Sequence, residues 1–178
     1  DENLGMAYGM GLTGEKVAAQ WNISREDQDA FALASHQKAC AAIAAGHFDN
    51  QITPYQTVKH LPGDAGSVRT VEKLAEHDEG PRPDTNAEAL AKLRPVFAAR
   101  GSVSAGNSSQ MSDGAAAIVL VSERILHELN LVPLARVVGF SVAGVPPEIM
   151  GIGPKMAIPK ALAQTGIAQQ DLDWVELN

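Results

Sequence analysis

An unbroken apolar run at residues 115–121, AAAIVLV, constrains the fold more than any other feature of the chain. A strand that is covered on both faces reads as a continuous hydrophobic run, whereas a strand with one wet face alternates. We therefore predict a buried strand here. Further strands are expected at 134–144 and 173–177, with helices between them at 123–129 and 154–165. This alternation of strand and helix is typical of an α/β fold.

The residues just before this run, 101–114 (GSVSAGNSSQMSDG), are almost all small. A plain connection needs only about two to six residues, so this stretch is long for one. Small side chains allow another group to approach the backbone closely, which would suit a ligand. Ser and Asn can also bond to their own backbone in a tight turn. The residues alone support the two interpretations about equally.

Two helices are expected near the start of the chain. Thr13 is a possible cap for a short helix that ends near Trp21. Ser24 and Asp27 resemble a capping arrangement and open a long helix that runs to about Ala45, where Gly46 stops it. The side chains expected to face inward from the long helix are Phe31, Ala34 and residues 41–43.

The middle of the chain is expected to be irregular. Residues 51–58 form a short strand that Pro54 restricts to a sheet edge. Residues 60–85 form a hairpin followed by an extended loop. Thr85 and Glu88 then form a capping box for a helix that carries Leu90 and Leu93 and ends before Pro95.

Composition excludes several classes of function. The chain has 178 residues with 14 basic and 21 acidic side chains, a net charge of −7, which disfavours a nucleic-acid partner. The single cysteine, Cys40, excludes an internal disulfide framework and suits a reducing compartment. No apolar run approaches the roughly 20 residues of a membrane helix, and the first residues do not resemble a signal peptide.

Familiar catalytic patterns are weak. GMGLTG, at residues 9–14, matches a dinucleotide-binding spacing, but no convincing strand precedes it. The five histidines are not spaced as zinc ligands, so we predict no metal site. Cys40 lies among alanines in the long helix, where a structural cysteine is commoner than a nucleophile.

Five separated segments occur in an order and spacing that resemble the thiolase family. They are MGLTGEKVAAQWNISREDQDAFALASHQKA, EALAKLRPVF, SAGNSSQMSDGAAAIVLVSE, IMGIGP and VELN. The resemblance covers essentially the whole chain and is closest to the degradative 3-ketoacyl-CoA thiolases. It implies a partial thiolase-like fold: an α-rich lid plus parts of two halves that each contain a mixed five-stranded sheet. On this map residues 1–109 are the lid, 110–132 end the first half and 133–178 begin the second.

The resemblance also implies the chemistry. Thiolases transfer an acyl group through a nucleophilic cysteine, with coenzyme A (CoA) as a substrate and no cofactor. The segments that would hold this cysteine and the catalytic histidine do not occur in the chain, so we expect the chain alone to be inactive. Asn178 matches an asparagine that holds an active-site water. We also expect the chain to be an internal fragment, because a sheet that stopped at residue 178 would leave an open edge.

The lid's expected role is to bind CoA, with the pantetheine arm lying along the small-residue stretch. The residues that match CoA-binding positions are Arg82, Phe97, Ala105, Ser108, Ser109 and Met150. Met10 and Met111 match the acyl pocket. Gly9 stands where some thiolases have a histidine.

Three functions remain open at this point. The first is a segment of a thiolase that cleaves 3-ketoacyl-CoA or condenses acetyl-CoA. The second is a non-catalytic CoA- or lipid-binding module, and the third is a plain interaction module. The resemblance favours the first and implies a homo-oligomer, a possible β-oxidation multienzyme partner, and a cytoplasmic location, or a mitochondrial or peroxisomal one in a eukaryote.

Overall fold

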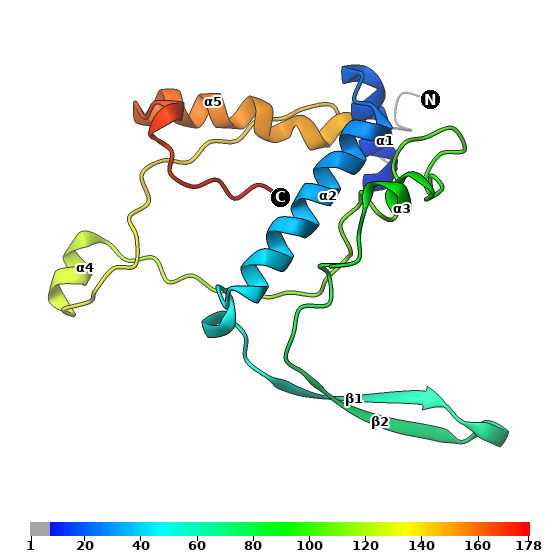
Figure 1. Ribbon diagram of the computed structural model, residues 1–178. Coiled ribbons are helices and arrows are strands. Elements are labelled where there is room, and N and C mark those ends of the chain that lie inside the picture. The colour runs from blue at the N-terminus through cyan, green and yellow to red at the C-terminus, as the bar shows by residue number, and fades with distance from the viewer. Residues whose placement is uncertain (1–7) are drawn as a thin grey trace. The chain divides into compact units, whose positions relative to one another are not determined.

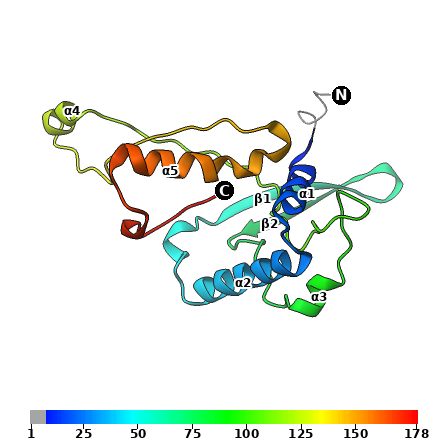
Figure 2. The ribbon, with the colours of Figure 1, turned by 90° about the horizontal axis from the view of Figure 1, so that it is seen from above.

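The computed structural model describes residues 8–178, which divide into two compact units. One consists of Ser24–Gln110, and the other, the two-segment unit, consists among the described residues of 8–23 and Met111–Asn178. Figures 1 and 2 show the elements of both. Each unit is described below by itself.

The longest helix, α2 (Arg25–Ala44), begins the Ser24–Gln110 unit. The Ser24 hydroxyl accepts a hydrogen bond from the Asp27 amide at 3.0 Å, so the predicted cap is confirmed. The helix ends before Gly46, whose φ of +71° is a conformation that favours glycine. The predicted inward face is wrong, because Phe31 is 80% exposed and the buried residue of α2 is Asp29.

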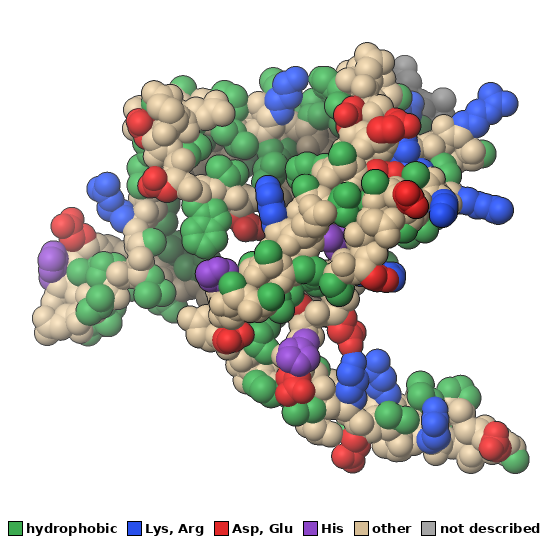
Figure 3. Space-filling view, in the orientation of Figure 1, with side chains coloured by type: hydrophobic (Ala, Val, Ile, Leu, Met, Phe, Trp, Pro, Cys, Tyr) green, Lys and Arg blue, Asp and Glu red, His purple; other side chains and the backbone are tan. Residues whose placement is uncertain are grey.

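A two-stranded antiparallel hairpin follows α2 after a short 3₁₀ turn at Asp49–Gln51. Strand β1 (Tyr55–Pro62) pairs with β2 (Val68–Ala75), with Tyr55 opposite Ala75 and Pro62 opposite Val68. The 3₁₀ turn Asp64–Gly66 joins the two strands. The predicted hairpin is confirmed, although β1 starts just after Pro54 and not before it. Figure 3 shows basic and acidic side chains along the hairpin, and both strands are largely exposed.

The short helix α3 (Ala87–Ala91) completes this unit and packs on α2. Its cap is Asn86, whose side chain accepts from the Ala89 amide at 2.9 Å. The predicted Thr85–Glu88 capping box is therefore wrong by one residue. Leu90 is buried at 3% exposure and supplies the apolar centre of the contact.

The two-segment unit contains α1 (Met10–Trp21), α4 (Glu123–Glu128), the 3₁₀ segment η4 (Pro147–Ile152), α5 (Gly153–Thr165) and the 3₁₀ turn η5 (Gln169–Asp171). Helix α1 begins after Gly9, earlier than predicted. Thr13 is buried inside the helix, where its hydroxyl donates to the Met10 carbonyl at 2.8 Å. The prediction that Thr13 caps the helix is wrong. Helix α1 packs against η4.

Helices α4 and α5 are confirmed where the sequence predicts them. The Ser122 hydroxyl accepts from the Ile125 amide at 3.4 Å at the start of α4. Helix α5 ends at Gly166, whose φ is +69°. Residues 134–144 run alongside α5 (Figures 1 and 2), and Lys160 Nζ donates to the Val142 carbonyl at 3.2 Å.

The strands predicted at 115–121, 134–144 and 173–177 do not form in this chain. Across residues 8–178 the structure has one sheet, the β1–β2 hairpin, so these segments have no ladder partners. A strand needs a neighbour for its backbone hydrogen bonds. Val119 is 87% exposed, although its sequence context is that of a covered strand. Figure 3 shows such hydrophobic side chains across the visible face.

The Ser24 cap gives a local prediction about α2. In the full-length protein that contains this chain, Ser24→Ala should weaken the first turn of α2 by about 1 kcal/mol, because the Asp27 amide loses its acceptor. Hydrogen exchange at the Asp27 amide should then be several-fold faster. Ser122→Ala is the matched control, and its longer bond predicts a smaller effect on α4. Unchanged exchange at Asp27 would contradict the role of Ser24.

Candidate functional site

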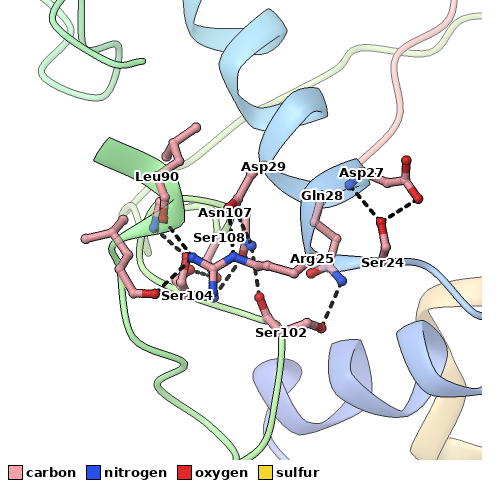
Figure 4. Close-up of polar contacts among 12 residues, drawn as sticks. Ser24, Arg25, Asp27, Gln28, Asp29, Leu90, Ser102, Ser104, Asn107 and Ser108 are labelled. Atoms are coloured by element: carbon pink, nitrogen blue, oxygen red, sulfur yellow. Dashed lines mark hydrogen bonds and ion pairs between the residues drawn. The ribbon is translucent and has the colours of Figure 1, made fainter. Parts of the chain in front are cut away.

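The small-residue stretch forms a turn, the serine loop (residues 102–109), which the protein holds by hydrogen bonds (Figure 4). Ser104 is fully buried, and its backbone forms an isolated antiparallel bridge with Pro95. Its hydroxyl accepts from the Gly106 amide at 3.3 Å, while its carbonyl accepts from the Ser108 hydroxyl at 2.7 Å. The backbone on both sides of Ala105 is therefore fixed by Ser104.

Asn107 uses all of its amide group to hold the same turn. Its Oδ1 accepts from the Ser104 amide at 2.8 Å. Its Nδ2 donates to the Ser102 carbonyl at 3.1 Å and to Asp29 Oδ1 at 3.0 Å. The bond to Asp29 attaches the loop to α2, although Asp29 and Asn107 are 78 positions apart in the sequence.

Gly106 explains part of the need for small residues. A Cβ on this residue would lie 2.5 Å from Leu90 Cδ2 and 2.5 Å from Leu93 Cδ1. The backbone therefore lies close against Leu90, in α3, and Leu93, which follows it. At Ser104 and Gly106 the small side chains are required by packing, which is the structural interpretation of the stretch.

Ala105 and Ser109 differ from these residues, because both are exposed. The Ser109 hydroxyl makes a 3.1 Å bond to the neighbouring Gln110 carbonyl. The Ser108 hydroxyl is half-buried and donates inside the loop. Ala105 and Ser109 are thus the two predicted contacts that the loop presents at its surface.

The segment that carries Arg82 lies beside the end of this loop. A Cβ on Gly80 would lie 2.6 Å from Gln110 Nε2, so the Gln110 side chain lies against the Gly80 backbone. The Arg82 amide donates to His36 Nδ1 on α2 at 3.1 Å. The structure therefore places Arg82 and Ser109 on neighbouring segments of one unit.

The Arg82 side chain is exposed and paired with Asp84, with Nη2 3.2 Å from Oδ2. The hydrogen bond and charge of Arg82 hold the pKa of the Asp84 carboxyl below its ordinary value, and Asp84 raises the pKa of Arg82 in return. An anionic ligand at Arg82 would compete with Asp84, so its contribution to binding should be small.

The other predicted residues lie in two places. Phe97 is half exposed in the Ser24–Gln110 unit and follows Val96, whose amide donates to the Val103 carbonyl at 3.1 Å beside the serine loop. Met10 and Met150 lie at the surface of the packed α1–η4 pair. Met111 is fully exposed, and Asn178 is exposed. Residues 8–178 contain no cluster of side chains that could hold a metal ion.

Sequence reasoning missed Asp29 and Arg25, which hold the loop. Asp29 lies at the buried face of α2, and Arg25 Nε donates to its Oδ2 at 2.8 Å. An Arg–Asp pair four residues apart reads as an ordinary surface pair on a helix. What distinguishes this pair is its bonds to Leu90 and Asn107, which lie 65 and 78 residues away in the sequence.

Two protein-family models match most of the chain. Residues 3–124 match the thiolase N-terminal domain and residues 131–178 match the thiolase C-terminal domain. The chain therefore belongs to the thiolase family, and its predicted fold class, a partial thiolase-like α/β fold, is confirmed.

Three relatives illustrate the similarity. A 3-ketoacyl-CoA thiolase of Bacillus subtilis is 47% identical over 95% of the chain and 43% of the relative. The human peroxisomal 3-ketoacyl-CoA thiolase is 50% identical over 95% of the chain and 39% of the relative. The structure of the dimeric peroxisomal thiolase of Saccharomyces cerevisiae is similar with a TM-score of 0.79 and 44% identity, covering 97% of this chain and 41% of that one. The chain thus spans about two fifths of their length.

The close packing of Gly106 is testable. Gly106→Ala should destabilise the full-length protein by about 1–3 kcal/mol, because the added methyl group must displace Leu90, which is buried. Gly114→Ala is the matched control, since nothing lies within 4 Å of its Cβ position. Its effect should stay within about 0.5 kcal/mol. Equal urea midpoints for the two variants would contradict the packing role.

Proposed function

We propose that the protein containing this chain is a 3-ketoacyl-CoA thiolase, and that this segment binds CoA. The observation that carries the proposal is the serine loop. Its backbone is fixed by partly buried hydrogen bonds, while Ala105 and Ser109 are exposed beside the segment that carries Arg82. Pantetheine is a thin arm with two amides, which suits a loop of small residues with an exposed hydroxyl.

The reaction proposed is thiolytic cleavage, in which a cysteine thiolate attacks the ketone carbon of a 3-ketoacyl-CoA. The bond between the α and β carbons breaks, the departing carbanion takes a proton as acetyl-CoA, and the acyl group stays on the sulfur. A second CoA thiol then takes the acyl group. The reverse sequence condenses acetyl-CoA with an acyl-CoA, which can be a second acetyl-CoA. Asn178, whose amide both donates and accepts, is proposed to hold a water that stabilises a developing oxyanion.

Each predicted contact has a proposed part in substrate binding. Ser109 bonds to a pantetheine amide, Ala105 and Ser108 line the arm, and Arg82 interacts with the adenine or phosphate end. Phe97 and Met150 flank the ligand, and Met10 and Met111 line the acyl pocket. The lid assignment of residues 1–109 belongs to the same proposal, although residues 1–7 lie outside the described part of the chain.

Assembly and location are proposed from the relatives. The yeast structure is named as dimeric, and the relatives include bacterial and peroxisomal proteins, which supports a homo-oligomer in a reducing compartment. Association with other β-oxidation enzymes rests on the resemblance alone. No helix among residues 8–178 is long and apolar enough to cross a membrane.

The function is tested by assaying the full-length protein for acetyl-CoA release from a series of 3-ketoacyl-CoA substrates in the presence of CoA. Turnover that requires both substrates supports the proposal. Binding of CoA without turnover would instead indicate a non-catalytic CoA-binding module, and absence of binding would contradict both.

Ser109 and Arg82 should act on CoA through different interactions. Ser109→Ala should raise the KM for CoA at all ionic strengths, because loss of one neutral hydrogen bond to a ligand amide costs about 1–3 kcal/mol. Arg82→Ala should raise it mainly at low salt, because exposed ion pairs contribute about 0–1 kcal/mol and are screened.

Matched controls exist for both variants. Ser67→Ala removes a hydroxyl that bonds to the Asp64 carbonyl in the hairpin turn, and Arg124→Ala breaks an exposed ion pair with Glu128 on α4. Neither should change the KM. A parental KM for Ser109→Ala at every salt concentration would show that the loop does not bind the pantetheine arm.

A further inference from the structure

Asp29 is the charged side chain that the Ser24–Gln110 unit buries most deeply among its described residues, and its two oxygens have different partners (Figure 4). Oδ2 accepts from Arg25 Nε at 2.8 Å. Oδ1 accepts from Asn107 Nδ2 at 3.0 Å. A buried carboxylate with both oxygens bonded is held in one orientation, since breaking either bond would leave charge without a partner.

Arg25 extends this arrangement to a third element. Its Nη2 donates to the carbonyl of Leu90 at 2.7 Å and to that of Leu93 at 2.9 Å, at the end of α3. The planar guanidinium can make these bonds and the bond to Asp29 at the same time. One ion pair therefore fixes α2, the end of α3 and the serine loop relative to one another.

We propose that Asp29 and Arg25 are positioning residues for the pantetheine arm of CoA, acting through Asn107. This inference rests on the proposed function, because it takes the serine loop as the pantetheine contact. Neither side chain touches the ligand. Their part is to hold the loop in the conformation that presents Ala105 and Ser109.

The chemistry of the amide explains why a carboxylate is needed. Asn107 has a donor end and an acceptor end, and only one orientation gives the Ser104 amide an acceptor. An ionised carboxylate accepts and never donates, so Asp29 requires Nδ2 of Asn107 to face it. Oδ1 is then left facing the Ser104 amide. The Ser102 carbonyl, which accepts from the same Nδ2, requires this orientation as well. The charge of Asp29 thus reinforces the orientation of Asn107 and attaches the loop to α2.

An asparagine in place of Asp29 would weaken this attachment. Its neutral amide accepts a weaker bond from Asn107 Nδ2 and forms no ion pair with Arg25. Asn107 would then keep its bonds to Ser102 and Ser104, but the loop would lose its charged link to α2.

The kinetic consequence is specific. A pantetheine arm that stays bound throughout the reaction contributes equally to the ground and transition states. A looser loop should therefore raise KM and leave kcat nearly unchanged. The effect should also persist with pantetheine itself as the acyl acceptor, since pantetheine retains the arm and lacks the nucleotide.

The experiment compares Asp29→Asn with Asp27→Asn in the full-length protein. Asp27 lies in the same turn of α2, but its carboxylate accepts from Ser24 and does not contact the loop. We expect Asp29→Asn to raise the KM about tenfold for both CoA and pantetheine, with kcat within about twofold of the parent. Asp27→Asn should match the parent, and Arg82→Ala should affect CoA but not pantetheine.

The outcomes separate this inference from the proposed function. A parent protein without thiolytic activity overturns the proposed function and this inference with it. If the parent is active and the Asp29→Asn and Asp27→Asn variants have the same KM, only the positioning role is overturned. A fall in kcat with unchanged KM also overturns it.

A second variant covers the case in which Asp29→Asn does not fold. Arg25→Lys keeps the positive charge beside Asp29 but loses the fork that reaches Leu90 and Leu93. Its KM for pantetheine should rise about threefold. A parental KM in a folded Arg25→Lys protein would then overturn the proposal.

Discussion

The carboxylate of Asp29 joins three parts of the Ser24–Gln110 unit that are distant in sequence. Through Arg25 it reaches the carbonyls at the end of α3, and through Asn107 it reaches the serine loop. The apolar contacts of this unit are few, with Leu90 its one buried hydrophobic side chain among the described residues. Its internal order therefore depends on polar bonds, and these are costly to break where they are buried.

Two requirements meet in the small-residue stretch, and they fall on different residues. Ser104 is small because its side chain is fully buried, and Gly106 because its backbone lies against Leu90 and Leu93. Ala105 and Ser109 are exposed, and packing does not explain their size. The stretch is thus a structural turn on one side and a candidate ligand surface on the other. The proposed function would use both, because a flexible substrate arm is best held by a surface that is already rigid.

Several local features were predictable from the sequence, although the caps expected at Thr13 and Thr85 were wrong, and the long-range contacts were not predictable. Caps at Ser24 and Ser122 and the glycine stops at Gly46 and Gly166 depend on neighbouring residues, and the structure confirms them. The prediction of a strand at 115–121 was wrong for this chain. An apolar pattern shows that a segment needs to be covered, but it does not supply the neighbouring strands. Asp29 was missed because its role depends on Asn107, which no local pattern connects to it. The family resemblance identified the fold and the candidate CoA residues, which physical reasoning alone left balanced between packing and binding.

A crystal structure of the full-length protein with CoA bound would test the central claim most directly. The claim is that a loop already fixed by Asp29 and Asn107 receives the pantetheine arm. We predict that Ser109 Oγ lies within hydrogen-bonding distance of a pantetheine amide. The Asp29–Asn107 and Asn107–Ser104 bonds should keep their present lengths of 3.0 Å and 2.8 Å. Pantetheine bound away from residues 105–109, or a serine loop that rearranges to admit it, would contradict the claim.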